Sequence, residues 1–417
     1  MKKRVLVKGP ALSRSGYGEQ TRFALRALRE HEDRFDIFLI NIPWGHTGYI
    51  INDDEERQWL DFLLQKTMQA IHNKQSFDIS LQVTIPNEWE RIAPINIGYT
   101  AGIETTKVAP QWIVKGAEMD RIIVVSNHSK QVYETTTCEV TNQQTGESIP
   151  DFRCETPIEV VNYPVRNFEP SSIEGFKLDF NFNFLSVAQW GPRKNLDNTI
   201  TWFLEEFADE KVGLVLKTNI AKDCLIDRLL TEQRLKNLLS RHQERKCKVY
   251  LLHGILSEEE MTWLYQHKKL KAMVSLTHGE GFGLPLFEAA YNGMPIIAPV
   301  WSGQADFLYG ENKKGKIRPM VASVGYTMQP VPDEAVWDGV IEKDSMWAHP
   351  NEKDYKKRLR EVYKSYDRHL SVAKKLKKNI IKNFKEEVAY QEFADKVWTP
   401  SEEESSWGET LEKIDLV

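Results

Sequence analysis

Short runs of apolar residues alternate with amphipathic stretches along most of the chain. In the first part, the apolar runs have the length of buried strands, while a stretch such as 20–29 places Phe23 and Ala27 on one helical face. Repeated strand–helix alternation predicts a parallel sheet that is covered by helices on both faces. The strands expected in this part are Val5–Val7, Phe35–Ile40, Asp78–Val83, Ile95–Thr100, Arg121–Ser126 and Ile158–Val161.

The alternation pauses at residues 162–177, a segment with two prolines and the turn-forming sequence Ser-Ser-Ile-Glu-Gly, and then starts again. The second set of expected strands is Phe182–Ala188, Val212–Lys217, Val249–Leu252, Ala272–Leu276, Ile296–Pro299 and Gly325–Met328. Helices are expected between them at Asn198–Ala208, Asp223–His242, Ser257–Gln266 and Pro285–Asn292. Two α/β units therefore follow one another, joined near residue 170. Ligands are expected in the cleft between such units, where loops after parallel strands converge.

Composition narrows the class of protein. The chain has 417 residues, a formal charge of −5 and 41% hydrophobic residues, which excludes a disordered or collagen-like protein. Four cysteines without a Cys-x-x-Cys pair exclude a dense disulfide framework and indicate neither zinc nor redox chemistry, so we expect a reduced, cytoplasmic protein. We expect no membrane-spanning helix and no secretory signal, because the apolar run before Lys8 is too short.

One segment departs from this mild overall charge. Residues 353–385 carry 13 Lys and Arg against three acidic residues, with a helical spacing of apolar positions. A solvated helix face is the plainest interpretation. Two alternatives are contact with anionic lipid, which would make the protein peripheral at a membrane, and contact with nucleic-acid phosphates.

The sharpest candidate for chemistry is a glycine-rich turn that follows an expected strand and precedes an expected helix. The backbone amides of Phe282, Gly283 and Leu284, with the helix dipole behind them, would form an anion site. Two carboxylates, Glu280 and Glu288, stand close by and would repel a phosphate unless they accept hydrogen bonds from sugar or ribose hydroxyls. The alternative is an ordinary strand–helix turn with two solvated glutamates.

Glu280 and Glu288 flank the sequence Gly281-Phe282-Gly283-Leu284-Pro285, which resembles the paired-glutamate motif of retaining nucleotide-sugar glycosyltransferases of the "glycosyl transferases group 1" family. Other segments resemble the family in the same order: a glycine loop at Ser15–Thr21, an Arg/Lys segment at Ser186–Asn195, and Val125–Ser129 with Val160–Val165 at the end of the first domain. The resemblance covers about residues 3–398. It implies the GT-B fold, an α/β architecture of two Rossmann-like parallel-sheet domains that face each other across a cleft.

The resemblance also implies the domain limits. Residues 1–170 are expected to form the acceptor domain, with a loop or hairpin insertion at about 138–156. Residues 171–382 are expected to form the nucleotide-sugar domain. Residues 383–417 are expected to form a helix that crosses back to the first domain, followed by an acidic tail.

Catalytic roles follow from the same resemblance. Arg193 and Lys194 are expected to bind the donor diphosphate and offset charge on the departing nucleoside diphosphate, while Glu280 binds hydroxyls of the donor sugar. A salt-bridged surface pair is the alternative for the two cations.

Donor-binding roles are implied for Glu288 on the ribose, for the backbone of residues 281–284, and for Gly16 and Gly18 near the phosphates. Lys217, at the end of an expected strand, is expected to touch the nucleotide or phosphates, with a solvated strand-end lysine as the alternative.

The acceptor side departs from the family. The family often has a histidine at the end of a first-domain strand, where this chain has Tyr99-Thr100-Ala101-Gly102-Ile103-Glu104. Glu104 is the candidate replacement; alternatively, it only caps Thr105 and Thr106 or pairs with Lys107.

The implied function is a metal-independent retaining glycosyltransferase. It would move a hexose from a UDP- or GDP-linked donor to a hydroxyl acceptor in a glycan, a lipid-linked sugar or a small molecule, without a cofactor beyond the donor. One alternative, motivated by the basic segment, is a DNA glycosyltransferase acting on hydroxymethylated bases. The other is a non-catalytic GT-B-like protein that binds nucleotide sugars or serves as a scaffold.

Overall fold

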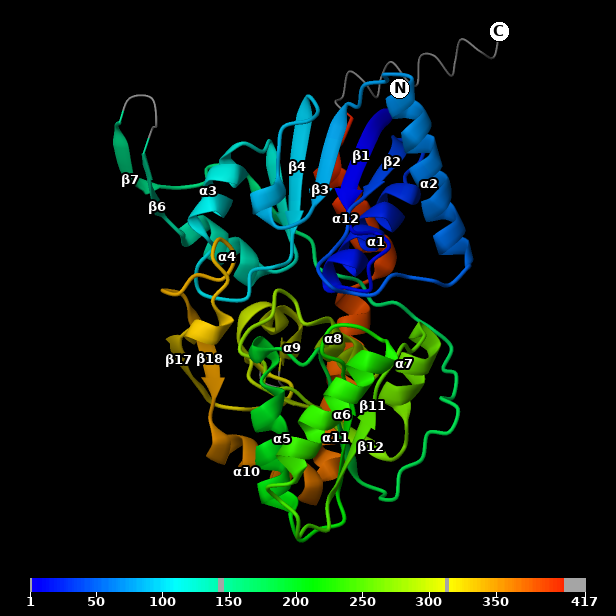
Figure 1. Cartoon of the computed structure of the whole chain (residues 1–417), viewed down its shortest axis with the longest axis vertical. Coiled ribbons are helices and arrows are strands. Elements are labelled where there is room, and N and C mark those ends of the chain that lie inside the picture. The colour runs from blue at the N-terminus through cyan, green and yellow to red at the C-terminus, as the bar shows by residue number, and fades with distance from the viewer. Residues whose placement is uncertain (1, 142–145, 312–314, 401–417) are drawn as a thin grey trace.

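The computed structural model describes residues 2–141, 146–311 and 315–400. Within these residues, two parallel sheets of six strands each follow one another along the chain, each flanked by helices (Figure 1). The first sheet has the order β2-β1-β3-β4-β5-β8. Its strands are β1 (Lys3–Gly9), β2 (Phe35–Asn41), β3 (Ile79–Val83), β4 (Ile95–Thr100), β5 (Arg121–Val124) and β8 (Ile158–Val160).

Four helices and a short 3₁₀ turn connect these strands: α1 (Gly16–Arg29), α2 (Glu55–His72), η1 (Pro86–Glu88), α3 (Pro110–Ala117) and α4 (Asn127–Thr135). Helix α1 begins where the Ser15 side chain accepts a hydrogen bond from the Gly18 backbone N–H, which is an N-cap. An antiparallel hairpin of β6 (Cys138–Thr141) and β7 (Ser148–Phe152) projects from the sheet between β5 and β8.

The second sheet has the order β11-β10-β9-β12-β13-β16. Its strands are β9 (Asn183–Val187), β10 (Gly213–Lys217), β11 (Lys248–Leu252), β12 (Leu270–Val274), β13 (Ile296–Ala298) and β16 (Ala322–Ser323). Its helices are α5 (Leu196–Phe207), α6 (Leu225–Leu239), α7 (Glu258–Gln266), α8 (Leu284–Tyr291), α9 (Ala305–Leu308), α10 (Glu352–Lys364) and α11 (Tyr366–Asn383). Two hairpins lie outside the sheet: β14 (Tyr309–Glu311) with β15 (Ile317–Pro319), and β17 (Tyr326–Pro330) with β18 (Met346–Pro350).

One expected strand is placed differently. The prediction put a strand at 325–328 in the second sheet, but the edge of that sheet is the two-residue strand β16. The chain then turns at Gly325, whose N–H donates to Asp354 Oδ2 at 2.6 Å, and Tyr326 enters the antiparallel hairpin with 37% of its surface exposed. This strand is too exposed for a buried parallel position, so its apolar pattern was misleading.

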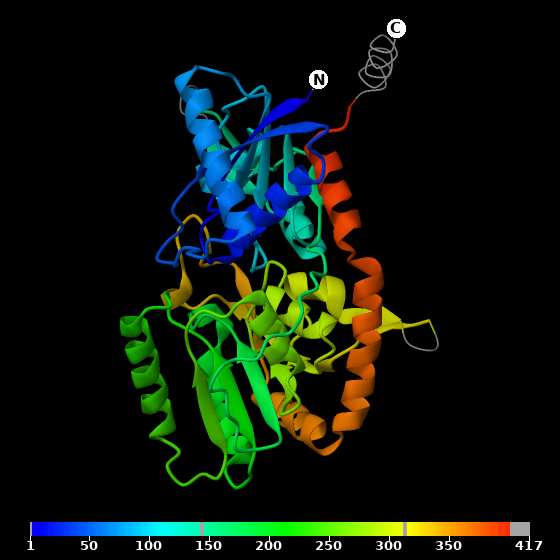
Figure 2. The same cartoon turned by 90° about the vertical axis from the view of Figure 1, so that its right-hand side faces the viewer.

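The basic segment forms two helices and leads back to the first domain. Helix α10 ends at Ser365, whose φ of −127° and ψ of 41° lie outside the helical range, and α11 starts directly after it. A further helix, α12 (Glu386–Val397), then packs on α1 (Figure 2). The last described helix therefore belongs to the core of the first domain.

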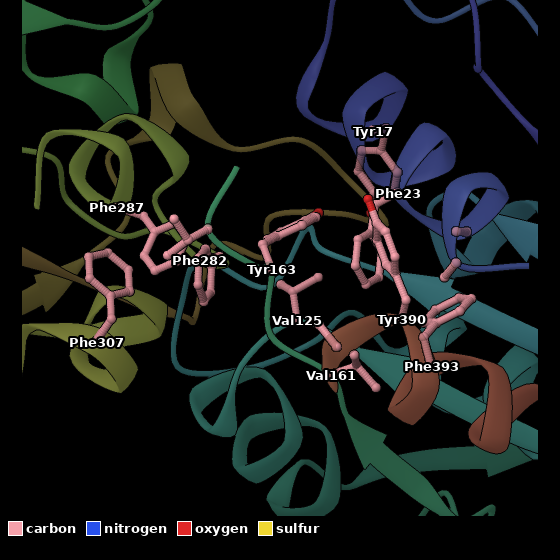
Figure 3. Close-up of a cluster of buried hydrophobic side chains, with 14 of the residues drawn as sticks. Tyr17, Phe23, Val125, Val161, Tyr163, Phe282, Phe287, Phe307, Tyr390 and Phe393 are labelled. Atoms are coloured by element: carbon pink, nitrogen blue, oxygen red, sulfur yellow. The ribbon is translucent and has the colours of Figure 1, made fainter. Parts of the chain in front are cut away.

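Aromatic side chains fill a core that continues from one domain to the other (Figure 3). Phe23 of α1 and Phe393 of α12 lie with ring centroids 5.2 Å apart. Tyr163 of the linker lies 5.2 Å from Phe282 of the second domain. Because all four rings belong to one buried cluster, the interface between the domains is held by the hydrophobic effect as well as by polar contacts.

Candidate functional site

The order of the strands brings the two predicted site loops together. Strand β9 lies between β10 and β12, so the loops after β9 and β12 leave neighbouring strands at the same edge of the sheet. Chain order reverses here, and such reversals open the crevice in which α/β proteins bind ligands. The loop after β9 forms η2 (Pro192–Lys194) and ends at Asn195, which has a left-handed φ of 53° and donates to the Leu276 carbonyl at 3.2 Å.

Arg193, Lys194 and Glu280 meet in an ion cluster at this point. Arg193 Nη1 lies 3.0 Å from Glu280 Oε2, and Lys194 Nζ lies 2.5 Å from Glu280 Oε1. Arg193 Nη1 also donates to the Gly279 carbonyl at 2.6 Å. The cations are therefore salt-bridged, as the alternative interpretation held, but between the two domains rather than on an open surface.

Glu280 is an ionised carboxylate in a nearly closed environment. Its residue surface is 7% exposed, and this burial alone would raise the pKa of its carboxyl. Lys194 and Arg193 outweigh the burial and hold the pKa at about 2. A carboxylate of this kind is a permanent hydrogen-bond acceptor at neutral pH.

Glu104 joins the cluster from the other domain. Arg193 Nε lies 2.7 Å from Glu104 Oε2, so one guanidinium bridges a carboxylate of each domain. Burial raises the pKa of Glu104, Arg193 opposes this, and the charge of Glu280 adds to it. Lys107 pairs with Asp344 instead, so the ion pair with Lys107 that the sequence left open is not formed.

The glycine-rich loop presses directly on the first domain. A Cβ at Gly281 would lie 1.8 Å from the Ala101 carbonyl oxygen, and one at Gly279 would lie 2.0 Å from that of Glu104. Gly18, likewise, is required by the carbonyl of Ser13, because its Cβ would lie 1.9 Å from that oxygen. These glycines permit protein–protein contact. Gly16, in contrast, is exposed and has open space beside it.

The start of α8 stands next to the ion cluster. Gly283 precedes the helix with a φ of 95°, and a Cβ there would lie 3.6 Å from the Cβ and Cγ of Glu280. The Phe282 side chain points into the shared core (Figure 3) and is 3% exposed, so its backbone alone could serve a ligand. Leu284 opens the helix and packs against the same core.

Glu288 lies on the same helix but in a different environment. Tyr265 donates its hydroxyl hydrogen bond to Glu288 Oε2 at 2.8 Å. Burial raises the pKa of Glu288 to about 8, and the charge of Glu258 adds to this shift. Among the described residues, Glu288 forms no ion pair with Arg193 or Lys194, so the structure separates the two glutamates of the motif.

A second charged network surrounds that position, which the sequence did not indicate. Glu19 of α1 is bound by Arg26 at 2.7 Å, Arg22 at 3.0 Å and Arg166 at 3.3 Å, and Arg166 also lies 3.9 Å from Glu258. Burial would raise the pKa of Glu19, but these arginines hold it well below its usual range. Residues from α1, the linker and α7 thus meet beside α8, a long-range arrangement without a local sequence signal.

Lys217 is partly buried at the end of β10. Its Nζ donates to the Gly254 carbonyl at 2.6 Å, and burial lowers its pKa. Asp227 steadies the neighbouring loop by accepting hydrogen bonds from the backbone of residues 220–222 and facing His253 Nε2 at 2.9 Å. The lysine therefore contacts a fixed turn and is not a freely solvated side chain.

Ser302 completes the ion cluster and was missed by the sequence analysis. It starts η3 (Ser302–Gln304) with a φ of 63°, and its Oγ accepts a hydrogen bond from the Glu280 backbone N–H at 2.9 Å. The Gly303 N–H donates to the Glu280 carbonyl at 2.9 Å. Glu280 is thus held on both sides of its backbone. A Ser-Gly pair directly after a strand was the available signal.

Two searches of the described residues gave no hit. No group of three or more His, Cys, Asp or Glu side chains there is arranged to hold a metal ion. No helix in that part of the chain combines the length and the apolar character needed to cross a membrane.

Sequence comparison gives one short match. No family model matches the chain. Over 118 residues, the chain is 31% identical to WbdA, a serotype-specific mannosyltransferase of Escherichia coli. The match covers 28% of this chain and 13% of the length of that relative.

Solved structures match over most of the chain. Sucrose-phosphate synthase from Thermosynechococcus elongatus has a TM-score of 0.59 at 12% identity, with 94% of this chain and 98% of that chain covered. Anabaena Alr3699/HepE, solved with UDP and glucose, has a TM-score of 0.54 at 12% identity with the same coverage of 94% and 98%. The two facing Rossmann-like domains of GT-B type, and the likeness to glycosyltransferases that the motifs indicated, are thereby confirmed.

Proposed function

We propose that the chain is a metal-independent retaining glycosyltransferase that moves a hexose from a nucleoside-diphosphate sugar to a hydroxyl acceptor. The observation that carries the proposal is the ion cluster, in which Arg193 and Lys194 are fixed beside a glycine-rich loop and a helix start. The segment shared with a mannosyltransferase and a fold neighbour solved with UDP and glucose support a nucleotide-sugar donor.

The chemistry requires a fixed positive site. The bond between the sugar and the diphosphate breaks, a bond to the acceptor oxygen forms, and negative charge develops on the departing diphosphate. Arg193 and Lys194 would stabilise that charge, since cations held in place by the protein need no reorganisation during the reaction. The loss of one such contact should cost roughly 3–4 kcal/mol in the transition state.

The carboxylates of the cluster stand in for the absent diphosphate. Glu280 and Glu104 neutralise the cations in this state, and a bound diphosphate would compete with them for Arg193 and Lys194. Glu280, held at its backbone by Ser302 and Gly303, would then accept hydrogen bonds from sugar hydroxyls. Glu104, released on the first-domain side, would face the acceptor.

The remaining donor groups are assigned to the nucleoside. Glu288 would bind the ribose, and Lys217 with the turn at Gly254 would border the base, on a UDP- or GDP-linked donor. Because Glu288 has a pKa of about 8 without ligand, it would have to lose its proton before accepting two ribose hydroxyls.

A thermal-shift screen of UDP-, GDP- and ADP-linked sugars tests the donor assignment. A ligand that binds the native state raises its apparent stability, so a shift with one nucleotide series identifies the base. Absence of a shift, and of hydrolysis, with every donor would contradict the proposal and favour a scaffold without nucleotide-sugar binding.

Stereochemistry and metal dependence need separate measurements. NMR of the anomeric proton in the product should show the configuration of the donor, and turnover should survive a chelator. An inverted product or loss of turnover on chelation would overturn these finer assignments without affecting the donor site.

A further inference from the structure

Helix α11 presents a basic face to the outside of the second domain (Figure 2). Its inward side is apolar, with Ala373, Leu376 and Ile380 buried. The opposite side mixes lysines with aliphatic residues and consists of Asp367, Leu370, Ser371, Lys374, Lys375, Lys378, Ile381 and Lys382. This set is called the α11 face below.

The charges of the α11 face are uncompensated. Lys374, Lys375, Lys378 and Lys382 are exposed, and within the described part of the chain none of them forms an ion pair. Asp367 is the one acidic residue in the helix sequence. On the preceding helix α10, in contrast, Lys356 and Arg360 each pair with glutamates of α5 or the loop after it.

Two hollows make this surface more than a convex helix. One, of about 400 Å³, is lined by residues of the α11 face, including Lys374, Lys375 and Lys378. The other, of about 440 Å³, lies at the junction of α10 and α11 and includes Arg318, Arg358 and Arg368, with Glu361 beside them. Both hollows are mainly basic and adjoin each other through neighbouring residues of α11.

We propose that the α11 face is a docking surface for an anionic phospholipid bilayer. A cluster of four to eight basic residues on an amphipathic helix attracts anionic headgroups, and the potential acts within about a Debye length of the surface. Leu370 and the 43% exposed Ile381 would enter the boundary between headgroups and acyl chains, while the hollows would receive phosphates.

The same charges suit a nucleic acid less well. Direct reading of bases relies on Arg, Asn and Gln side chains, and single strands are bound by stacking on aromatic rings. The α11 face carries lysines and aliphatic groups instead, and the nearby Tyr366 packs inward against Phe182 with a centroid distance of 5.9 Å.

Vesicle flotation with the full chain tests this surface. The protein should float with vesicles of phosphatidylglycerol and phosphatidylcholine, should stay behind with pure phosphatidylcholine, and should be released by high salt. The variant K374Q/K375Q/K378Q/K382Q should partition at least about tenfold more weakly. A matched variant, K74Q/K211Q/K222Q/K236Q, removes four exposed lysines elsewhere and should bind as the unmodified protein does.

Three results would overturn the proposal: no flotation with the anionic vesicles, equal loss in both four-lysine variants, or tighter binding to a DNA duplex than to the vesicles at the same salt. Unchanged thermal melting of both variants shows that folding is not the cause. A further variant, I381S, should lower the fraction of protein that resists salt release, and no change there would remove the aliphatic part of the proposal.

Discussion

The protein treats its cations in two opposite ways. At the domain interface, Arg193 and Lys194 have side chains 23% and 17% exposed and are matched by carboxylates from both domains. On the α11 face, lysines stand exposed without acidic partners among the described residues. The first arrangement holds a few charges in fixed geometry, and the second holds many charges with little geometric constraint.

The difference follows from solvation. A cation removed from water requires a partner, because the desolvation cost is otherwise several kcal/mol. An exposed lysine is stabilised by water and needs none. The buried cluster can therefore bind an anion only by exchange for its own carboxylates, whereas the α11 face can bind one by displacing salt ions. Each of the following experiments acts on one side of this comparison.

The largest effect is expected when the buried cations are removed. The double variant R193A/K194A should lower turnover by at least about 10³-fold, since each fixed charge contributes roughly 3–4 kcal/mol to the transition state. It also leaves Glu280 buried without its partners, which should destabilise the fold by about 3–5 kcal/mol. Turnover of the donor and urea unfolding measure the two effects.

The double variant K374A/K375A is the matched control for that experiment and should keep full turnover with the same donor. Retained turnover in R193A/K194A would exclude these cations as the diphosphate site.

Acid–base linkage at Glu288 is the next largest effect. Its folded pKa of about 8 exceeds the unfolded value near 4.5, so the folded state holds a proton that the unfolded state has lost. This group's contribution to stability is complete below pH 4.5 and should disappear as the pH rises through about 8. Urea unfolding of the parent protein and of E288Q should give stability curves that diverge over this window. Parallel curves would mean that Glu288 is ionised in the free protein.

A smaller effect is expected from the interdomain ion pair. Replacing Glu104 with glutamine should tighten pyrophosphate binding by about tenfold, a gain of roughly 1.4 kcal/mol, because the anion no longer displaces a carboxylate from Arg193. Calorimetry with pyrophosphate and with nucleoside diphosphates measures this directly. If Glu104 instead supports the donor site, E104Q will bind more weakly, while E104D should remain near the parent value.

The smallest effect belongs to the α11 face. The four-lysine variant should melt within about 0.5 kcal/mol of the parent protein, since exposed and unpaired side chains contribute little to folding. Its turnover with a soluble donor and acceptor should also be unchanged. A large loss of stability would show that these lysines have partners in the folded chain.

Local pattern predicted most of the fold. Buried strands such as Ile79–Val83 are short apolar runs bounded by turn residues, and these signals depend on few neighbours. The segment 325–328 failed because its pattern was apolar but its strand pairs in an exposed hairpin. The division of the basic segment at Ser365 was also not predicted, because lysine-rich helical spacing continues on both sides of it.

The site was predicted in its parts but not in its connections. Arg193, Lys194 and Glu280 stood out because two loops followed neighbouring strands. The pairing of Arg193 with Glu104 joins residues from different domains, and no local pattern reports such a contact. The separate network around Glu288 was missed for the same reason, and it divides a motif that looks continuous in the sequence.

Helix α12 has a consequence for the order in which the protein acquires its structure. The groove on α1 that receives Phe393 belongs to the first half of the chain, yet the helix that fills it is translated after the entire second half. During synthesis, therefore, the first Rossmann unit emerges from the ribosome with an apolar flank that stays uncovered until the second unit has been made. Chaperone occupancy on nascent chains should accordingly persist until residues 386–397 have left the exit tunnel.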